Sequence, residues 1–314
     1  MRAVTIVDNK IEIRDHPDPV PAKGELLVRV RAAGLNKADL MQAQGFYPAP
    51  PGSPPDIPGL ELAGEVVSTG EGVSEFDKGD RVMAIVGGGA QAELAVVHER
   101  IAMRVSDAVP FAEAGGVPEA FLTAHDALFT QGQVTIGDRV LVHGAAGGVG
   151  TAAVQLAAAA GAHVTASVRN DRLWDGVARL GAAEVVAHDD FADRGPFDVI
   201  LELVGAGNMA GNLAALNRSG RIVVIGVGGA GASAEVDLLT LMGKRGLITG
   251  STLRARPLEE KALVTRRAEA HAVPLLASGA VRALIEDTYP LAEAAAAYER
   301  FNQGGKLGKI VLVT

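Results

Sequence analysis

A glycine-rich run between an apolar segment and an alanine-rich one constrains the fold more than any other feature. Residues 139–143 have the composition of a buried strand, and residues 148–160 predict a helix. Small residues between a strand and a helix let the backbone approach a pyrophosphate, and the helix N-terminus offers free N–H groups to phosphate oxygens. A tight turn without a ligand is the alternative. The expected cofactor contacts are Gly144, Ala145, Ala146, Gly147, Gly148, Val149 and Gly150.

The pattern around this run alternates strands with helices. Apolar strands separated by helices indicate a parallel sheet covered on both faces, and the right-handed crossover rule makes it doubly wound. The alternation begins near residue 119. Its further segments are a strand at 163–167, a helix at 171–180, and strands at 185–186, 198–202 and 221–225.

The chain before residue 119 has the composition of a β-rich domain. Short alternating runs bounded by turn residues predict strands. These strands are expected at 4–7, 11–14, 25–32, 61–68 and 80–86. Residues 48–58 are rich in proline and cannot form a helix, so they form either a plain surface loop or a loop over a pocket.

The residues after the second strand of the parallel sheet bear on cofactor choice. An acid at this strand end would bind the ribose diol of NAD. Ser167 and Arg169 stand here instead, with Arg172 close by, and all three can donate to a 2′-phosphate. The alternative is that both arginines are solvated and that Asp171 neutralises one of them. We expect NADPH to be the cofactor.

Composition excludes several classes of protein. The 314 residues are 48% hydrophobic and 21% charged, which is ordinary for a globular chain. The net charge of −8 argues against nucleic acid as the main partner. There is no cysteine, so disulfides and cysteine ligands are impossible. No signal-peptide pattern and no apolar run of about 18 residues is present, so we expect a cytoplasmic protein without a membrane span.

Several further motifs, in order along the chain, resemble one known family. The chain resembles the zinc-free, zeta-crystallin-like quinone oxidoreductases of the medium-chain dehydrogenase/reductase superfamily, over essentially its whole length. The motifs are residues 33–39 (AGLNKAD), 45–48 (GFYP), 58–66 (PGLELAGEV), 122–124 (LTA), the glycine run, 250–254 (GSTLR) and 305–312 (GKLGKIVL).

The resemblance implies the architecture. A partly open, GroES-like β-barrel catalytic domain would comprise residues 1–118 and 252–314. A doubly wound Rossmann domain for NADP would comprise residues 119–251, inserted between them. The active site would lie in a cleft between the two domains, where ligand sites commonly occur.

The resemblance also implies site residues. Asn36, Asp39 and Tyr47 would be catalytic. The further cofactor contacts would be Thr123, Gly226, Val227, Ser251, Arg254, Lys306 and Lys309. Asn36 and Asp39 are also favoured helix-capping residues, so capping is an alternative that can hold together with function. Tyr47 either packs or donates a hydrogen bond or proton to the acceptor oxygen.

The sequence departs from the zinc-dependent relatives. These carry a cysteine after the early glycine and a histidine before the acid that corresponds to Glu61, whereas Leu60 precedes Glu61 here. The seven histidines are scattered and show no ligand spacing. We therefore expect no metal.

The implied activity is hydride transfer from NADPH to a quinone or an α,β-unsaturated carbonyl compound. Two alternatives remain: an enoyl-thioester reductase and a non-catalytic NADPH-binding protein. Residues 245–250 resemble an edge strand of the nucleotide sheet. Because edge strands invite pairing, we expect a homodimer.

Overall fold

The chain folds into two compact units. The computed structural model describes residues 1–227 and 231–314. Unit 1 comprises Met1–Leu122 and Leu253–Thr314, and unit 2 comprises Thr123–Thr252. The limits expected from the sequence were 118/119 and 251/252. The first observed limit falls inside helix α3 (Pro118–His125), so no turn or linker in the sequence marks it.

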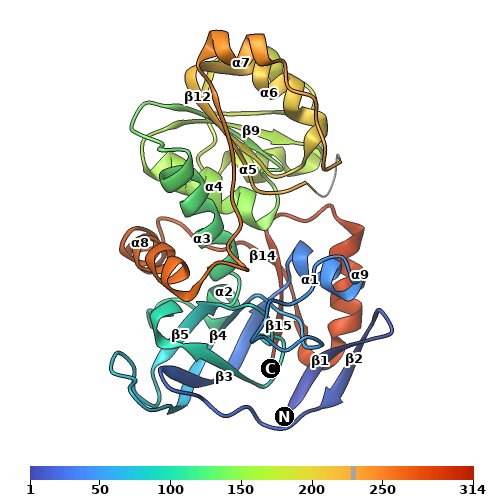
Figure 1. Cartoon of the computed structure of the whole chain (residues 1–314), viewed down its shortest axis with the longest axis vertical. Helices are drawn as coiled ribbons and strands as arrows, with labels where there is room; N and C mark the ends of the chain where they lie inside the picture. The colour runs from blue at the N-terminus through green and yellow to red at the C-terminus, as the bar shows by residue number, and fades with distance from the viewer. Residues whose placement is uncertain (228–230) are drawn as a thin grey trace. The chain divides into compact units, whose positions relative to one another are not determined.

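Unit 1 is built on a largely antiparallel sheet in the order β14-β15-β3-β4-β5-β7, to which β6 is added through β3 (Figure 1). Its strands are β3 (Glu25–Gly34), β4 (Glu61–Thr69), β5 (Arg81–Ile85), β6 (Leu94–His98), β7 (Ala102–Arg104), β14 (Ile285–Pro290) and β15 (Lys309–Val313). A separate hairpin joins β1 (Arg2–Val7) and β2 (Lys10–Asp15).

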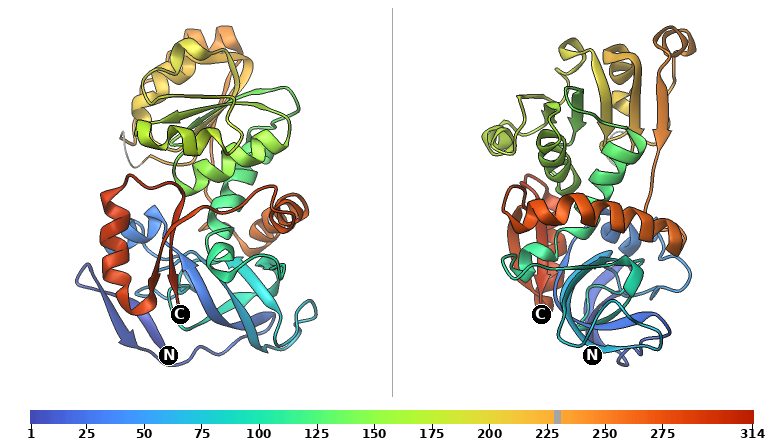
Figure 2. Two further views of the ribbon diagram at one scale, coloured as in Figure 1. Left: turned by 180° about the vertical axis from the view of Figure 1, so that it is seen from behind. Right: turned by 90° about the vertical axis from the view of Figure 1, so that its left-hand side faces the viewer.

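The helices of unit 1 are short except two. They are α1 (Lys37–Ala43), α2 (Phe111–Ala114), α8 (Leu258–Ala277) and α9 (Ala294–Gln303), with single 3-10 turns at Glu99–Ile101 and Leu291–Glu293. Helix α3 begins in this unit. Helix α9 packs against β2, β14 and β15 (Figure 2).

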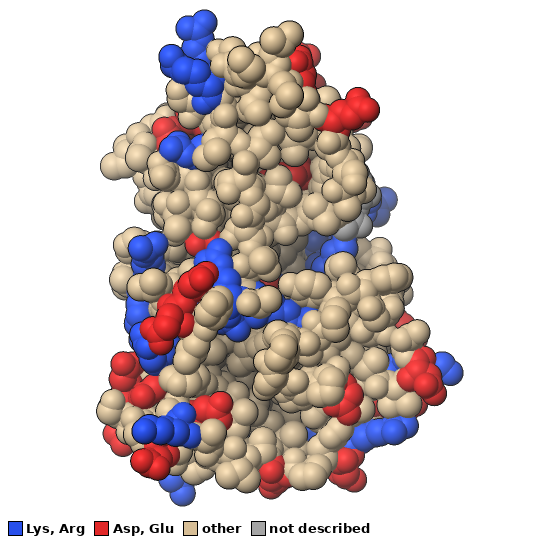
Figure 3. Space-filling view, viewed as in Figure 1, with Lys and Arg blue, Asp and Glu red and all other residues tan. Residues whose placement is uncertain are grey.

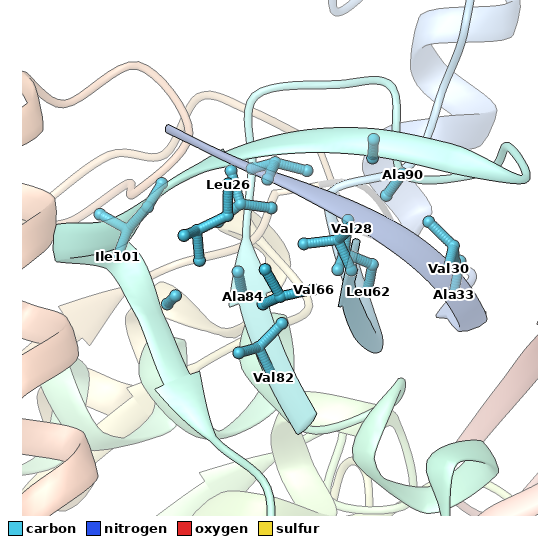
Figure 4. Close-up of a cluster of buried hydrophobic side chains, with 14 of the residues drawn as sticks. Leu26, Val28, Val30, Ala33, Leu62, Val66, Val82, Ala84, Ala90 and Ile101 are labelled. Carbon is cyan, nitrogen blue, oxygen red and sulfur yellow. The ribbon is translucent and has the colours of Figure 1, made fainter. Parts of the chain in front are cut away.

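The core of the barrel follows from the two-residue period of its strands. In β3, Leu26, Val28 and Val30 are buried whereas Arg29 and Arg31 are exposed. Successive side chains of a strand point to opposite faces, so alternation buries one face only. Figure 4 shows these apolar side chains gathered with those of the neighbouring strands.

Unit 2 is a parallel six-stranded sheet in the order β10-β9-β8-β11-β12-β13. This is the doubly wound dinucleotide-binding order, with β8 as the first strand. The strands are β8 (Arg139–His143), β9 (His163–Val168), β10 (Glu184–Ala187), β11 (Phe197–Glu202), β12 (Leu216–Val224) and β13 (Leu247–Gly250). The order reverses between β8 and β11, and ligands bind in such sheets beyond the carboxyl ends of the strands at this point.

Short helices connect the strands of unit 2. They are α4 (Gly148–Ala159), α5 (Trp174–Ala178), α6 (Met209–Ala215) and α7 (Leu238–Lys244), with 3-10 turns at Asp171–Leu173, Ala192–Arg194 and Ala206–Asn208. Helix α3 continues into a π-helical segment, η2 (Asp126–Gln131). The single helix expected at 171–180 is a 3-10 turn followed by the short helix α5.

The surface carries both charge signs. On the face in Figure 3, Lys and Arg side chains lie among Asp and Glu side chains, with uncharged areas between them. Several form ion pairs, such as Arg104 with Asp80 at 2.7 Å. None of the helices in the described part of the chain has the length and apolar character to cross a membrane.

Candidate functional site

The N-terminus of α1 places the first candidate residues. Asn36 is the N-cap residue with extended backbone angles, and Asp39 lies in the first turn. The Asp39 carboxylate accepts a hydrogen bond from the Asn36 backbone N–H at 2.8 Å, which is half of a capping box. The capping alternative therefore holds for Asp39, and a contact of either residue with substrate stays a prediction.

The side chain of Asn36 belongs to a buried polar group around Lys309. The Lys309 ammonium donates to Asn36 Oδ1 at 2.5 Å, lies 2.5 Å from Glu61 Oε1, and donates to the Leu35 carbonyl at 2.9 Å. Asn36 Nδ2 in turn donates to Glu61 Oε1 at 2.9 Å. We call Asn36, Asp39, Glu61, Glu119 and Lys309 the Lys309 cluster.

Lys309 and Asn36 have little left to offer a ligand in this arrangement. An ammonium has three donors, and all three of Lys309 are used inside unit 1. The second donor of the Asn36 amide points to the Gly34 carbonyl at 3.4 Å. Lys309 is only 4% exposed. The predicted contact of Lys309 with the cofactor stays a prediction.

Asp39 is fully buried and still well bonded. Besides the Asn36 N–H, its oxygens accept from the Gly59 backbone N–H at 3.2 Å and from Gln91 Nε2 at 3.3 Å. Gln91 Oε1 accepts from the Tyr298 hydroxyl at 2.9 Å. Burial raises the pKa of Asp39 to about 7, although the N–H bond from Asn36 and the Lys309 charge oppose this shift.

Glu119 is the least satisfied acid of the cluster. Its backbone N–H donates to Glu61 Oε2 at 2.9 Å, which brings the first turn of α3 against β4. Its own Oε2 is buried and finds no hydrogen-bond partner among the described residues. Burial, and then the nearby Glu61 carboxylate, raise the pKa of Glu119 to about 7.

Arg254 ties three segments of unit 1 together. It donates to the Gly87 carbonyl at 2.9 Å, to the Tyr47 carbonyl at 3.0 Å and to Gln42 Oε1. Its guanidinium carbon lies 4.9 Å from the centre of the Tyr47 ring. With Arg254 only 4% exposed, its role here is to hold the Tyr47 loop, and its contact with the cofactor stays a prediction. The Tyr47 hydroxyl has no hydrogen bond within the described residues.

Lys306 is held differently from Lys309. Its ammonium lies 4.4 Å from the centre of the Phe301 ring. Burial, with Lys309 and Arg300 adding like charge, lowers the pKa of Lys306 to about 8. No hydrogen bond or ion pair in the described residues engages its ammonium, so Lys306 retains donors for an anion.

In unit 2 the glycine run forms the loop between β8 and α4. Gly144 adopts a φ of 61°, in the left-handed region that favours glycine. Gly147 is the N-cap of α4. A Cβ on Gly150 would lie 2.3 Å from the Gly144 carbonyl oxygen, so only glycine allows this close approach of helix and loop. The N–H groups of Ala145 and Gly147 donate to the Ser167 and Gly144 carbonyls at 3.2 and 3.0 Å, so the N–H groups suited to a phosphate are those of the first turn of α4.

A buried network lies directly below this loop, at the point where the strand order reverses. His143 Nε2 is 2.7 Å from Asn212 Oδ1, and Asn212 Nδ2 donates to Glu202 at 2.8 Å. This assigns the histidine proton to Nε2 and leaves Nδ1 as an acceptor for the Ser167 hydroxyl at 3.3 Å. Burial lowers the pKa of His143 and keeps the ring neutral. The Ser167 hydrogen then points inward.

The other candidates of unit 2 differ in exposure. Arg169 and Arg172 are exposed at the end of β9, whereas Ser167 is 2% exposed. The Thr123 hydroxyl is buried without a partner among the described residues. Ser251 donates to Asp126 at 2.9 Å. Gly226 and Val227 follow β12, and Val227 is 43% exposed.

The residues around Glu61 do not fit a zinc ion. Leu60, which precedes the acid, is apolar and 1% exposed, and Glu61 is bound by Lys309 and Asn36. Across residues 1–227 and 231–314, no three His, Asp or Glu side chains are arranged to hold a metal ion. The chain contains no cysteine.

Some residues of the site were not singled out from the sequence. Glu61, Gln91 and Glu119 are members of these networks, yet each stands alone between apolar or small neighbours. This isolation is the sequence feature that could have identified them, because a single polar residue within an apolar stretch is expected to be buried and hydrogen-bonded. The same signal marks Glu202 at the end of β11.

Comparison with known proteins identifies the family. The alcohol dehydrogenase GroES-like domain family matches residues 22–107, and the zinc-binding dehydrogenase family matches residues 180–312. The quinone oxidoreductase of Rattus norvegicus is 32% identical over 308 residues, which cover 94% of this chain and 91% of that protein. The chain belongs to the zeta-crystallin-like quinone oxidoreductase family of the medium-chain dehydrogenases/reductases.

Other relatives of this quinone oxidoreductase family member agree in fold. An alcohol dehydrogenase superfamily protein from Novosphingobium aromaticivorans superposes with a TM-score of 0.88 at 28% identity, covering 100% of this chain and 99% of that one. The polyketide synthase GfsB of Streptomyces halstedii is 38% identical over 209 residues, 65% of this chain but 4% of the synthase. The predicted fold class, a GroES-like domain with a Rossmann domain, is confirmed. The protein is an oxidoreductase of small molecules with a domain for NAD(P).

Proposed function

We propose that this protein is an NADPH-dependent, zinc-independent reductase of quinones or α,β-unsaturated carbonyl compounds. The observation that carries the proposal is the 32% identity with a quinone oxidoreductase over 94% of the chain. The glycine loop at the switch point of unit 2 supports a bound dinucleotide. The apolar Leu60 and the Lys309–Glu61 ion pair support a reaction without zinc.

NADPH supplies the hydride, and the chain supplies position and polarity. The glycine loop and the N-terminus of α4 hold the pyrophosphate. The Tyr47 hydroxyl, free of partners within the described residues, donates to the acceptor oxygen as negative charge develops there. Arg254 fixes the Tyr47 loop through its backbone carbonyl and ring. Excluding water and orienting the acceptor supply most of the acceleration.

The preference for NADPH rests on the two exposed arginines that follow β9. Both arginines are exposed, and no acid ends the strand, which supports Arg169 and Arg172 as donors to a 2′-phosphate. The Ser167 hydrogen is directed to His143, so serine contributes as a donor only after the network rearranges.

We also propose a homodimer formed through β13. This strand is the last of its sheet, and no strand of residues 1–227 or 231–314 pairs with its outer edge. Large apolar side chains are exposed on it and on the preceding helix. They are Leu238 (66%), Leu239 (80%), Met242 (71%) and Leu247 (48%). A second copy pairing along this edge would cover them.

The activity is tested with purified protein and four acceptors: a benzoquinone, a naphthoquinone, a short enal and a medium-chain enoyl thioester. NADPH consumption is followed, with NADH in parallel. Turnover of quinone or enal with NADPH supports the proposal. The match to part of a polyketide synthase keeps the enoyl-thioester alternative in the test, and preference for the thioester would favour it. NADPH binding without any turnover would favour a non-catalytic binding protein, and a preference for NADH would refute the arginine assignment.

A further inference from the structure

The Lys309 cluster contains more acids than its cation can neutralise. Three carboxyl groups lie around one buried ammonium, that of Lys309, which contacts Glu61 and whose charge acts on Asp39 and Glu119. Among the described residues, the one other cation whose charge acts on Asp39 and Glu119 is Arg254, which is bonded to neutral oxygens. Two unneutralised carboxylates in a buried site repel each other, so the low dielectric favours a bound proton.

The hydrogen bonds identify the acid that holds this proton. Glu61 accepts from Asn36 and from the Glu119 backbone and contacts Lys309, so both of its oxygens are engaged by donors. Asp39 accepts three N–H hydrogen bonds, which favour the charged form. Glu119 Oε2 is buried and accepts no hydrogen bond from any residue that the structure describes. A neutral carboxyl group is the form of Glu119 that this environment favours.

We propose that Glu119 carries a proton inside unit 1 and supplies it to the acceptor after hydride transfer. This role rests on the proposed function. Hydride addition leaves an enolate from an enal, or a hydroquinone anion from a quinone. The O–H bond of Glu119 breaks and its electron pair remains on the carboxylate. The proton bonds to the enolate carbon or the hydroquinone oxygen, and water later returns a proton to Glu119.

The surroundings of Glu119 suit a group that alternates between two charge states. Glu61 on β4 and Asp39 on α1 raise the pKa of Glu119, whereas Lys309 on β15 and Arg254 lower it. The result is a pKa of about 7, and an acid is most effective when its pKa lies near the working pH. Its place in the first turn of α3 leaves the carboxylate near the positive end of the helix once the proton has gone.

The test replaces the acid by its neutral isostere, Glu119→Gln, and compares two acceptors. A short enal gives a basic enolate that needs an acid, whereas tetrachlorobenzoquinone gives a weakly basic anion that needs none. We expect kcat for the enal to fall about 100-fold and kcat for tetrachlorobenzoquinone to stay within about threefold. In the wild type, kcat/KM for the enal should decline above about pH 7, and this decline should be absent from Glu119→Gln and present in Glu119→Asp.

Glu113→Gln is the matched control, because Glu113 is a partly buried acid on α2 whose pKa is also raised by burial but which lies outside the cluster. It should retain wild-type rates. Thermal unfolding and NADPH binding check that each variant is folded. Equal losses with both acceptors, or an unchanged pH profile in Glu119→Gln, would overturn the proposal while leaving the reductase function standing. A wild type inactive with every acceptor would refute both.

Discussion

At the residue scale, Gly34 shows how closely the Lys309 cluster is packed. A Cβ at this position would lie 2.3 Å from Glu61 Oε1 and 2.9 Å from the Gly115 carbonyl oxygen. The absence of a side chain therefore lets the Glu61 carboxylate reach Lys309 and Asn36. Gly34, on β3, belongs to the motif AGLNKAD. A glycine is required there because the carboxylate of Glu61, on the neighbouring strand β4, occupies the space of a Cβ.

We expect Gly34→Ala to lower the free energy of unfolding by about 1–3 kcal/mol, as overpacking a filled core does. Urea unfolding measures the change. Gly243→Ala is the control, because a Cβ there meets no atom within 4 Å and alanine favours the helix. Its stability should be unchanged or higher. Equal stability of Gly34→Ala and the wild type would contradict the tight fit.

The raised pKa of Glu119 also predicts how stability depends on pH. A carboxyl group whose pKa is higher in the folded state binds its proton more tightly there. Its contribution to the free energy of unfolding is complete below the pKa that Glu119 has in the unfolded chain. This contribution is lost as the pH rises through about 7. Glutamine does not titrate, so the Glu119→Gln variant does not lose stability in this way. The free energy of unfolding of Glu119→Gln, relative to the wild type, should therefore increase between pH 5 and pH 8 in urea titrations.

The exposed Glu71→Gln serves as the control for this pH series. Its difference from the wild type should be the same at both pH values. A difference for Glu119→Gln that is also independent of pH would show that Glu119 ionises as an ordinary acid in the folded protein.

At the element scale, the β8–α4 connection is the element that we propose to bind the cofactor pyrophosphate. We expect Gly150→Ala to weaken NADPH binding by at least about tenfold, because its Cβ would meet the Gly144 carbonyl at 2.3 Å and displace the loop. Titration of NADPH fluorescence measures the affinity. Gly243→Ala, in the same unit, is again the control and should leave the affinity for NADPH unchanged. Unchanged affinity in Gly150→Ala would contradict a pyrophosphate at this loop.

The free edge of β13 gives a second prediction for an element. We expect Leu247→Asp to convert a dimer of two 32.2 kDa chains into monomers, because it buries a charge in the proposed interface. Light scattering at matched concentrations measures the mass. Leu263→Asp, at a leucine 59% exposed on α8 in unit 1, should remain dimeric. A wild-type mass of one chain would refute the dimer.

The sequence predicted elements better than contacts. Strands β8, β9, β11 and β12 were predicted because parallel strands are continuous apolar runs, and the glycine loop because its spacing is local. Helices α8 and α9 were not assigned, because α8 contains Pro274 and most of the apolar residues of α9 are alanines. For Lys309 the sequence predicts a cofactor contact but not its partners within the chain, since nothing near it in sequence reveals that these are on β4 and before α1.

At the scale of the whole molecule, each unit carries its own buried polar network. Unit 1 holds the Lys309 cluster, and unit 2 holds the His143–Asn212–Glu202 network below the glycine loop. Fully bonded buried groups fix the ends of several elements at once, and a partly satisfied one such as Glu119 marks a place where chemistry is possible.

Cofactor choice is a property of the whole enzyme and is tested by charge reversal. We expect Arg169→Glu combined with Arg172→Glu to reduce the ratio of kcat/KM for NADPH over NADH by at least about a hundredfold, since two charge-assisted hydrogen bonds of roughly 1.5–3 kcal/mol each are lost. Arg179→Glu reverses an exposed arginine at the end of α5 and should leave the ratio unchanged. If the NADPH/NADH ratio of kcat/KM were the same in the double variant and in Arg179→Glu, Arg169 and Arg172 would not bind the 2′-phosphate.

The transfer of deuterium from NADPH labelled at C4 to an enal tests hydride transfer most directly. Two forms of NADPH are used, each with deuterium in one of the two C4 positions, and the saturated product is analysed by mass spectrometry. We expect one deuterium on the β-carbon of the product from one of the two labelled forms, and none from the other. Two results would contradict a reductase that passes a hydride to its acceptor. One is a saturated product that carries no deuterium from either labelled form, and the other is oxidation of labelled NADPH without any saturated product.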